Sequence, residues 1–381
     1  MPAADVTLDD LDARHHEVLA ELRRQAPVTW VDAIGGWVVT GRDTAVEVMR
    51  DPVRFTVDDP RFSTAQVVGP SMLSLDGTEH ERHRSPFASA FRPSEVTRRY
   101  ADGVPTVARR LVGELAPRGE AELRRELAGP LAVAVVARSL GLDDLDPVRL
   151  LAWYDAIVAG VADIALGRPA ADDAWRAFGL LGEALDRAAR RPDSVLLEAA
   201  ASLTRDEVVS NAAVFLFGGI ETSEGMTANL VHHVLARPGV AERIRRDRSL
   251  VDAAVEESLR LEPAAARVDR FATCDVVLGG ARVRTGDFVV ISLAAANRDP
   301  AVYDQPDEFR LDRGNGRTHV AFAQGPHACL GAQLARMEAR AALDAVLDLL
   351  PGVELIEPPV TSGVIFRKPV SVHARWSPAT A

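Results

Sequence analysis

The sequence predicts a mainly helical protein with a small β-rich region, and three observations support this fold class. Residues 105–203 carry helical patterns almost throughout, and the pattern of residues 204–237 continues for about 33 residues, or ~50 Å at ~1.5 Å per residue. Strand-like runs with glycines between them lie within residues 276–291. Hydrophobic residues make up 47% of the 381 residues and charged residues 26%, which suits a large core. Because no linker is evident, we expect residues 1–381 to form a single domain.

The N-terminal segment predicts a helix, a hairpin and a second helix. Apolar residues recur at helical spacing over residues 8–24, which predicts one amphipathic helix. Two short β-rich runs, 29–31 and 37–39, flank a pair of glycines and predict a β-hairpin. Residues 42–50 predict the next helix.

Residues 55–75 lack clean periodicity and contain prolines and a glycine, so we expect a long loop. Loops of this length often have a function. The apolar residues of this loop either cap an apolar pocket or simply anchor the loop, and the sequence favours neither. The residues that follow begin a helix on which His80 and Arg84 are four positions apart and therefore lie on one face. Both side chains can reach one anion.

Proline and glycine divide residues 105–203 into several helices. Breaks are expected at 117–119, 141–143, 167–169 and 191–193. The long helix that follows opens with a capping box, in which Thr204 is the N-cap and Glu207 the third helical residue. Its pattern continues to Pro238, so this helix can cross the whole molecule.

The C-terminal half contains the β region and the last long helix. Helices are expected at 251–261 and 332–350, strands at 276–278, 281–283 and 288–291, and an irregular stretch at 297–319. The tail, residues 360–376, alternates enough to predict a closing hairpin.

Charge, cysteine content and hydropathy exclude several classes of protein. The formal net charge of -11 argues against a general nucleic-acid binder, which normally has a basic face. With only Cys274 and Cys329, no disulfide framework holds the fold, which suits a reducing cytoplasm. Residues 1–14 lack the apolar core of a signal peptide, and the most apolar internal run, 212–220, is too short to span a bilayer. We expect a cytoplasmic protein with no membrane or nucleic-acid partner.

A loop with several glycines, residues 322–331, presents Cys329 just before a helix. Helix N-terminal amides favour a thiolate, and the thiolate is the form of cysteine that binds a metal. Gly325 and Gly331 allow the backbone to approach a large flat cofactor, and His327 can donate to an anionic group at the edge of that cofactor. The alternative is that Cys329 is a small buried hydrophobe, the usual role of a lone cysteine.

Two glycines, Gly218 and Gly219, stand in the middle of the long helix and are followed by Glu221 and Thr222. Glycine costs about 1 kcal/mol relative to alanine inside a helix, so a pair needs a reason. Either another segment packs closely here or the helix is locally opened. At an opening, the carboxylate and the hydroxyl can relay protons to a bound oxygen species. If the glycines serve packing, Glu221 is solvated and Thr222 bonds back to the helix.

The cysteine loop closely resembles the haem-binding loop of the cytochrome P450 family. The residues that match its pattern are Phe322, Gly325, His327, Cys329 and Gly331. Ala323 departs from the pattern, because a glycine is common at that position. The resemblance implies the cytochrome P450 fold and a haem b cofactor whose iron has Cys329 as its axial ligand.

Further motifs of the family follow in its order over nearly the whole chain, from His80 to Trp376. The pair Glu221-Thr222 resembles the acid and the alcohol that steer protons during dioxygen activation, with Gly218 in place of the more usual alanine at the cofactor. The resemblance assigns the two haem propionates to His80, Arg84, Arg270 and His327. It assigns a structural role to Glu257, Arg260 and Arg313.

The resemblance also implies where substrate would bind. By position, the pocket residues are Met72, Leu73, Val214, Phe217, Ala265, Ala266, Val364 and Ile365. Their small and apolar character implies an apolar or moderately polar small molecule.

The implied activity is that of a bacterial soluble monooxygenase, which inserts one oxygen atom from dioxygen into a small molecule of secondary metabolism. Electrons would come from NAD(P)H through separate redox proteins, a ferredoxin reductase and a ferredoxin, and the enzyme would be a monomer. Arg336 and Arg340 are candidates to meet an acidic ferredoxin. The alternatives are oxidative coupling, direct use of peroxide, and a haem-binding protein without turnover.

A few further residues are expected to have no role in the chemistry. The pairs His15-His16 and His232-His233, and also Glu256, lack metal-like partners in the sequence, and we expect them on solvated faces.

Overall fold

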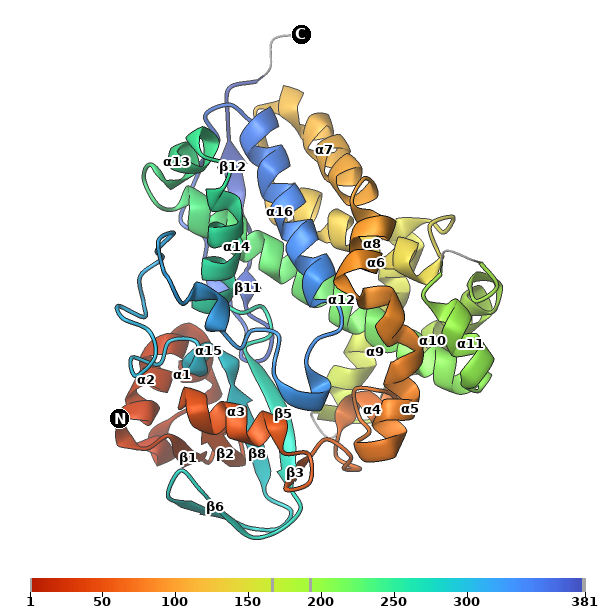
Figure 1. Ribbon diagram of the computed structural model, residues 1–381, viewed down its shortest axis with the longest axis vertical. Coiled ribbons are helices and arrows are strands. Elements are labelled where there is room, and N and C mark those ends of the chain that lie inside the picture. Colours follow the sequence, from red (N-terminus) through yellow and green to blue (C-terminus); the bar gives the residue numbers. More distant parts are fainter. Residues whose placement is uncertain (1, 166–167, 192–193, 379–381) are drawn as a thin grey trace.

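The computed structural model describes residues 2–165, 168–191 and 194–378. Most helices pack together in one part of the molecule, and the main sheet lies in the other part with the N-terminal helices (Figure 1). The largest hydrophobic cluster lies among the helices, and a second one lies against the sheet. The prediction of a mainly helical protein with a small β region is confirmed.

The main sheet joins segments from both ends of the chain. Its strand order is β1 (Val28–Val31), β2 (Gly36–Val39), β8 (Phe288–Ser292), β5 (Arg267–Ala272) and β3 (Phe55–Thr56). The predicted hairpin is confirmed as the antiparallel pair of β1 and β2, and β2 pairs in parallel with β8. The inner strand β5, next to β8, and the edge strand β3 were not expected.

A second, smaller hairpin extends from the β region. It consists of β6 (Val276–Leu278) and β7 (Ala281–Val283), which pair antiparallel. The prediction of strands at 276–278, 281–283 and 288–291 is therefore confirmed. Gly279 and Gly280 form its turn with φ of 54° and 86°, a conformation that favours glycine.

The expected single helix over residues 8–24 is wrong. The structure has α1 (Leu8–Ala13) and α2 (His15–Gln25), separated at Arg14, whose φ of -120° and ψ of 36° are not helical. The reason is local, since Thr7 and Asp10 form a capping box that sets the axis of a short first helix. The helix predicted at 42–50 is confirmed as α3 (Arg42–Arg50).

The expected loop at residues 55–75 is also partly wrong. It begins with β3 and contains the short helix α4 (Ser63–Val68), in which Val67 and Val68 are buried. Burial of these side chains stabilises a helix that local periodicity does not reveal. The following helix, α5 (Gly77–Ala88), carries His80 and Arg84.

The middle of the chain is helical, as predicted. Its helices are α6 (Pro93–Tyr100), α7 (Gly103–Leu115), α8 (Gly129–Leu140), α9 (Pro147–Ala165), α10 (Asp172–Ala188) and α11 (Leu196–Ser202). The break at 117–119 leads into the short strand β4 (Glu120–Glu122) and a π-helical turn at Arg124–Ala128. The breaks expected at 167–169 and 191–193 lie partly outside the described residues.

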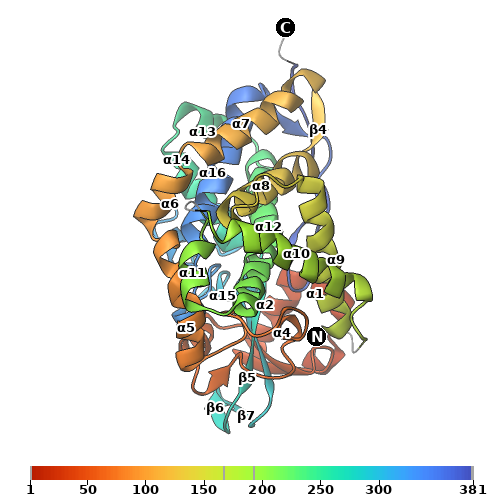
Figure 2. The same ribbon diagram turned by 90° about the vertical axis from the view of Figure 1, so that its right-hand side faces the viewer.

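The long helix α12 (Arg205–Leu235) runs through the centre of the molecule, with α8, α9 and α10 around it (Figure 2). Its 31 residues begin at the predicted capping box of Thr204 and Glu207. A Cβ atom on Gly219 would lie 2.5 Å from Val136 of α8, so this glycine allows close packing of two helices. Close packing against α8 therefore fixes the position of the middle turns of α12.

Three C-terminal helices pack against α12. These are α13 (Val240–Arg246), α14 (Leu250–Leu261) and α16 (Ala332–Leu349), which also packs on α7 and α14. The short α15 (Leu293–Ala296) instead lies beside the sheet and contacts α2, α3 and β5. The helices predicted at 251–261 and 332–350 are confirmed. Within the described residues, none of the helices has both the length and the apolar character needed to cross a membrane.

The tail forms more than the one hairpin that was expected. Strands β10 (Thr361–Ser362) and β11 (Lys368–Pro369) pair antiparallel. The last strand, β12 (His373–Arg375), instead pairs with β4 and with β9 (Glu354–Leu355). The end of the chain is therefore joined to β4 and β9, while β11 packs against α12.

Candidate active site

Cys329 lies between a 3-10 turn at Gly325–His327 and the first turn of α16. Part of Cys329 is exposed at the surface of the protein. The protein atoms around the thiol nevertheless bury it enough to raise the pKa of Cys329. The backbone N–H groups of Gly331 and Ala332 and the charge of Arg84 act in the opposite direction. The expected effect of the helix N-terminus is thus present, but burial outweighs it. A metal ion would supply the missing positive charge, because coordination deprotonates a thiol.

Any metal at Cys329 must bring most of its own ligands. In the parts of the chain that are described, no three side chains of His, Cys, Asp or Glu gather in a way that could hold a metal ion. A single thiolate is the protein ligand set of a haem-thiolate site, since the porphyrin supplies the nitrogen ligands. The donor set therefore fits haem.

The glycines of the loop have different surroundings. Gly325 has a φ of 73°, and a Cβ atom there would collide with the carbonyl oxygen of Met49 in α3, so this glycine seats the loop on α3. A Cβ atom on Gly331 would lie 3.9 Å from the sulfur of Cys329, which is ordinary contact. The ring of Phe322 is half-buried and lies 4.5 Å from the guanidinium of Arg336.

Four basic side chains gather at the cysteine loop: His80 and Arg84 of α5, Arg270 of β5, and His327 of the loop itself. The rings of His80 and His327 are 4.3 Å apart, and His327 Nε2 is 2.8 Å from Asp76 Oδ1. Arg84 Nη2 donates to the carbonyl oxygen of Ala328 at 2.5 Å. Sequence spacing predicted that the histidine and the arginine of α5 share a face, and the structure places both near the loop.

These basic groups have too few anions around them. Arg270 on β5 is 4% exposed, and its Nη1 donates to the carbonyl of Asp269. Burial lowers the pKa of both Arg84 and Arg270. Burial and the positive charges of His327 and Arg84 lower the pKa of His80 to about 4. The Nε2 atom of His80 has no partner. Because buried cations require anions, the cluster fits a ligand with carboxylates such as the haem propionates.

The middle of α12 contains an open position. Gly218 is exposed although its neighbours in the helix, residues 214–217 and 219–222, are buried or half-buried, and a Cβ atom on it would meet no atom within 4 Å. Val214 lies one helical turn before Gly218 and Phe217 lies one residue before it, and both side chains are half-buried. Thr222 donates its hydroxyl hydrogen to the Gly218 carbonyl, the back-bond to the helix that the sequence left open. The two glycines thus differ, since Gly219 packs and Gly218 leaves room.

Glu221 has two partners that the sequence did not suggest. Its Oε2 accepts a hydrogen bond of 2.9 Å from the Tyr154 hydroxyl of α9, and its Oε1 lies 2.7 Å from Lys368 Nζ of β11. It forms no hydrogen bond with Thr222 in the part of the chain that is described. The sequence held one indication of the second partner, because Lys368 is its only lysine.

The structure brings together the three residues expected to have a structural role. Glu257 and Arg260 of α14 form a two-armed ion pair at 2.8 and 2.9 Å, and both side chains are almost fully buried. Arg313 Nε lies 2.9 Å from the same carboxylate. Both arginines also donate to backbone carbonyls of the irregular stretch, including that of Glu308. They fasten residues 304–308 onto α14.

The expectation of solvated faces is wrong for several residues. Glu256 is 6% exposed and binds Arg336 Nε at 2.6 Å and His319 Nε2 at 3.0 Å. His15 and His233 are buried as well. Sequence patterns could not show this, because the residues that cover these side chains come from distant parts of the chain.

The two arginines expected to meet a ferredoxin already have carboxylate partners. Arg336 binds Glu256, and Arg340 lies 2.5 Å from Asp252 of α14. Their charges are therefore largely compensated within the chain, which weakens them as a docking surface.

The residues expected to line the substrate pocket differ in their exposure to solvent. The half-buried ones are Leu73, Val214, Phe217, Ala265 and Val364. Met72 is 6% exposed, Ala266 is 1% exposed, and Ile365 is 43% exposed. The sequence did not single out Phe366, whose ring packs edge-on against Phe217 at 5.4 Å.

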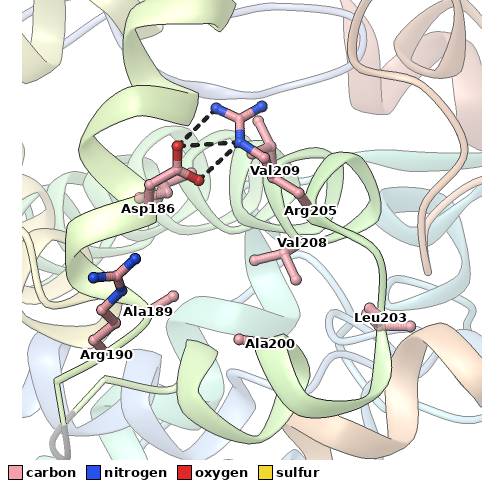
Figure 3. A pocket seen from close by; sticks show the side chains of 9 residues that line it. Asp186, Ala189, Arg190, Ala200, Leu203, Arg205, Val208 and Val209 are labelled. Carbon is pink, nitrogen blue, oxygen red and sulfur yellow. Dashed lines mark hydrogen bonds and ion pairs between the residues drawn. The ribbon is translucent and has the colours of Figure 1, made fainter.

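Two surface hollows lie away from these residues. One of about 230 Å³ lies between α10, α11 and α12, where Asp186 pairs with Arg205 (Figure 3). The other, of about 370 Å³, is lined by residues of α14 and the irregular stretch, including Arg310 and Arg317. Neither hollow contains Cys329 or Gly218, so neither belongs to the candidate active site.

Comparisons with known proteins agree with this site. The family described as cytochrome P450 matches residues 192–350. Nocardicin C N-oxygenase from Nocardia uniformis subsp. tsuyamanensis is 33% identical and covers 95% of each chain. Mycinamicin IV hydroxylase/epoxidase from Micromonospora griseorubida is 31% identical over 93% of this chain and 94% of the relative. The solved structure of cytochrome P450 CYP109Q5 from Chondromyces apiculatus matches with a TM-score of 0.88 at 26% identity over 100% of both chains. The chain therefore belongs to the cytochrome P450 family and is a haem-dependent monooxygenase.

Proposed function

We propose that this P450 inserts one oxygen atom from dioxygen into an apolar or moderately polar small molecule of secondary metabolism, by hydroxylation or epoxidation. The observation that carries the proposal is the cysteine loop with Cys329 close to the half-buried Arg84 and the buried Arg270, two arginines that lack sufficient anions. The names of two relatives, an N-oxygenase and a hydroxylase/epoxidase, support oxygen insertion. One turnover consumes dioxygen, two electrons and two protons, and it yields the oxygenated product and water.

Haem b, when bound, supplies the one-electron and dioxygen chemistry. Cys329 would ligate its iron, and Arg84, Arg270, His80 and His327 would bind the propionates. Phe322 and Gly331 would flank the sulfur, Gly325 would keep the loop seated on α3, and Gly218 would leave room for the cofactor's open side. The structural trio of Glu257, Arg260 and Arg313 would hold the segment that precedes the loop.

We assign the handling of protons to α12. Glu221 would hold the proton that is delivered, and the Thr222 hydroxyl would pass it on from one turn after Gly218. Protonation at the correct oxygen separates productive turnover from release of peroxide, so a positioned acid and alcohol are needed. Retention of both residues disfavours an enzyme that uses peroxide directly.

The substrate would lie against the apolar side chains beside Gly218. We retain Met72, Leu73, Val214, Phe217, Ala265, Ala266, Val364 and Ile365 as pocket residues, and we add Phe366. Met72 is held by its backbone N–H, which donates to Asn211 Oδ1 of α12 at 2.9 Å. The loop that ends before α5 is thereby tied to the helix that carries the acid.

Electrons would come from NAD(P)H through a ferredoxin reductase and a ferredoxin, as separate cytoplasmic proteins, to a monomeric enzyme. Since Arg336 and Arg340 are engaged by carboxylates, we expect only a modest decrease in the rate of reduction with added salt. A steep decrease would point to another basic surface.

Two measurements test the proposed function. The carbon monoxide difference spectrum of the reduced protein is expected to have the thiolate-type Soret band of the family, and its absence would exclude Cys329 ligation. Product analysis under isotopically labelled dioxygen, with a surrogate ferredoxin system, is expected to find one labelled oxygen atom in the product. Product without label would indicate oxidative coupling, and no product with a normal Soret band would indicate a haem-binding protein.

A further inference from the structure

Lys368 contacts two carboxylates of α12 at once. Its Nζ lies 2.7 Å from Glu221 Oε1 and also binds Glu224 Oε2. The side chains of Lys368 and Glu224 are each 13% exposed. An ion pair this sheltered is held more firmly than a surface pair, because water screens it less.

The approach of β11 to α12 depends on a small residue. A Cβ atom on Gly225 would lie 3.5 Å from the Cβ of Lys368 and 3.0 Å from that of Ala264. Glu221, Glu224 and Gly225 share one helix face, since they are three and four positions apart. The stem of the lysine therefore lies across Gly225, and its ammonium group reaches both carboxylates.

Tyr154 of α9 holds the other oxygen of Glu221, to which its hydroxyl donates at 2.9 Å. Burial and the charge of Glu221 raise the pKa of Tyr154, so that it remains a neutral donor. The other charged groups near this contact are Asp155 on α9 and Arg124 of the π turn, which binds Glu224 Oε1 at 3.0 Å. Each oxygen of Glu221 thus has one fixed partner.

We propose that Tyr154 and Lys368 are positioning residues for proton delivery, which hold the carboxyl group of Glu221 in one orientation next to Thr222. This inference rests on the proposed function, because it requires that Glu221 delivers protons. Without these two partners, a half-buried glutamate would sample several rotamers, and a misplaced group loses catalytic efficiency steeply.

The same short segment carries a wall of the substrate pocket. Phe366 stands two residues before Lys368, and it forms a β-bridge with Ala265 and packs on Phe217. Between them, the N–H of Arg367 donates to the carbonyl of Ala264 at 2.8 Å. The ring that packs on Phe217 and the lysine that holds Glu221 therefore belong to one short segment, which is fixed to residues 264–265.

A lysine label tests the contact without turnover. Because Lys368 is the only lysine, lysine labelled with ¹³C at Cε gives a single side-chain signal. In the haem-loaded, carbon monoxide-bound ferrous protein, which is diamagnetic, we expect this signal to differ from that of free lysine and to move in Glu221→Gln and Tyr154→Phe. The matched control is Arg375→Met, which removes an exposed ion pair with Glu354 and should leave the signal unchanged. A signal identical to free lysine overturns the inference.

Dioxygen reduction tests the consequence for chemistry. The rate of dioxygen consumption with a surrogate ferredoxin system is measured in the absence of substrate, across pH and in heavy water. We expect Glu221→Gln, Lys368→Met and Tyr154→Phe to slow the proton-dependent step, by about 10-fold for the first two, and to enlarge the solvent isotope effect. Lys368→Arg should restore most of the rate, and Lys368→Met should add nothing in a Glu221→Gln background.

The outcomes separate this inference from the proposed function. If Glu221→Gln leaves the rate unchanged, the role of Glu221 itself is wrong. If Glu221→Gln slows the reaction but Lys368→Met and Tyr154→Phe do not, only the positioning inference is wrong. A full additional loss from Lys368→Met in the Glu221→Gln background would also overturn it. Haem content and thermal unfolding identify a variant that fails to fold. If Lys368→Met fails to fold, the rates of Lys368→Arg and Tyr154→Phe still decide whether the positioning inference is right.

Discussion

Arg84 of α5 donates a hydrogen bond of 2.5 Å to the carbonyl oxygen of Ala328, the residue that precedes Cys329. The guanidinium is buried enough for its pKa to be lowered, and the charge of Cys329 opposes this shift. Arg84 therefore holds the loop at the point from which the sulfur extends, and it places a buried positive charge beside it. Both effects favour binding of an anionic cofactor that the thiolate can ligate.

Replacing Arg84 is expected to weaken haem binding. Arg84→Ala removes a charge-assisted hydrogen bond worth roughly 1.5–3 kcal/mol, so the affinity for haem should fall about 10- to 100-fold. The rate of haem transfer to apomyoglobin measures this loss. Arg98→Ala is the control, because Arg98 is exposed and binds only its helix neighbour Glu95. Equal haem retention in the two variants would show that Arg84 holds the cysteine loop but contributes nothing to haem affinity.

The two cysteines allow a matched test of ligation. Cys329→Ser replaces the thiolate by a poor ligand, so the reduced protein with carbon monoxide should lose the thiolate-type Soret band. Cys274→Ser changes the other cysteine, which is exposed in the turn after β5, and should keep the band. The absorption spectrum provides the readout, with the haem content of each variant determined separately. A shifted band in Cys274→Ser and a normal one in Cys329→Ser would reverse the assignment.

The buried trio around Glu257 should be essential for stability. Arg313→Ala leaves a carboxylate that is 1% exposed with one cation fewer, and breaking such a pair costs about 3–5 kcal/mol. Urea unfolding followed by tryptophan fluorescence measures the change in the free energy of unfolding. The control is Arg375→Ala, whose ion pair with Glu354 is exposed and should contribute little. Similar midpoints for both variants would mean that solvent reaches Glu257 in solution.

Local signals predicted the elements that local forces determine. The capping box of Thr204 and Glu207 predicted the start of α12. The glycines at 279–280 predicted the turn between two strands. The motif around Cys329 could be recognised because the loop is continuous in sequence. Spacing on one helix likewise predicted that His80 and Arg84 share a face.

Contacts between distant segments explain what the sequence could not show. Strand β5 carries charged residues at 267, 269 and 270, a pattern unusual for a strand inside a sheet, and it forms because β8 and β3 pair with its two edges. Glu221 looks solvated in sequence, whereas Tyr154 and Lys368 reach it from α9 and β11. Neither partner can be inferred without the tertiary arrangement.

His15 should make the protein less stable in acid. Burial, with a smaller contribution from Arg367, lowers the pKa of His15 to about 3, and its Nε2 has no partner. The unfolded chain has the ordinary pKa of about 6.5 and binds the extra proton, so stability falls as the pH decreases from about 6.5 to 3. The contribution is of the order of 3–5 kcal/mol at the acid end and absent above pH 6.5.

The variant His15→Gln removes this titration. Its free energy of unfolding, measured by urea at successive pH values, should depend less steeply on pH than that of the original protein over this window. His373→Gln, at an exposed position of β12, is the control and should keep the original slope. Parallel curves for all three proteins would show that His15 is protonated in the folded state.

Ala323 occupies a position in the cysteine loop that favours glycine. Its φ of 57° lies in the left-handed region, which costs an L-residue roughly 1–2 kcal/mol, whereas glycine loses about 0.5–1 kcal/mol through its greater freedom when unfolded. Ala323→Gly should therefore stabilise the protein by about 0.5–1 kcal/mol, as measured by urea unfolding. The control Ala335→Gly, inside α16, should destabilise it by about 1 kcal/mol.

The methyl group of Ala323 decides whether the full gain appears. It packs at the edge of the hydrophobic cluster of the sheet, so glycine also loses a small apolar contact there. If Ala323→Gly leaves the midpoint unchanged, this contact offsets the backbone strain. If it destabilises, the contact with the sheet outweighs the strain, and the family's usual glycine at this position would then be absent for a packing reason. Measuring the haem-free and haem-loaded proteins separates an effect on the loop from an effect on cofactor affinity, since strain relief alone should stabilise both.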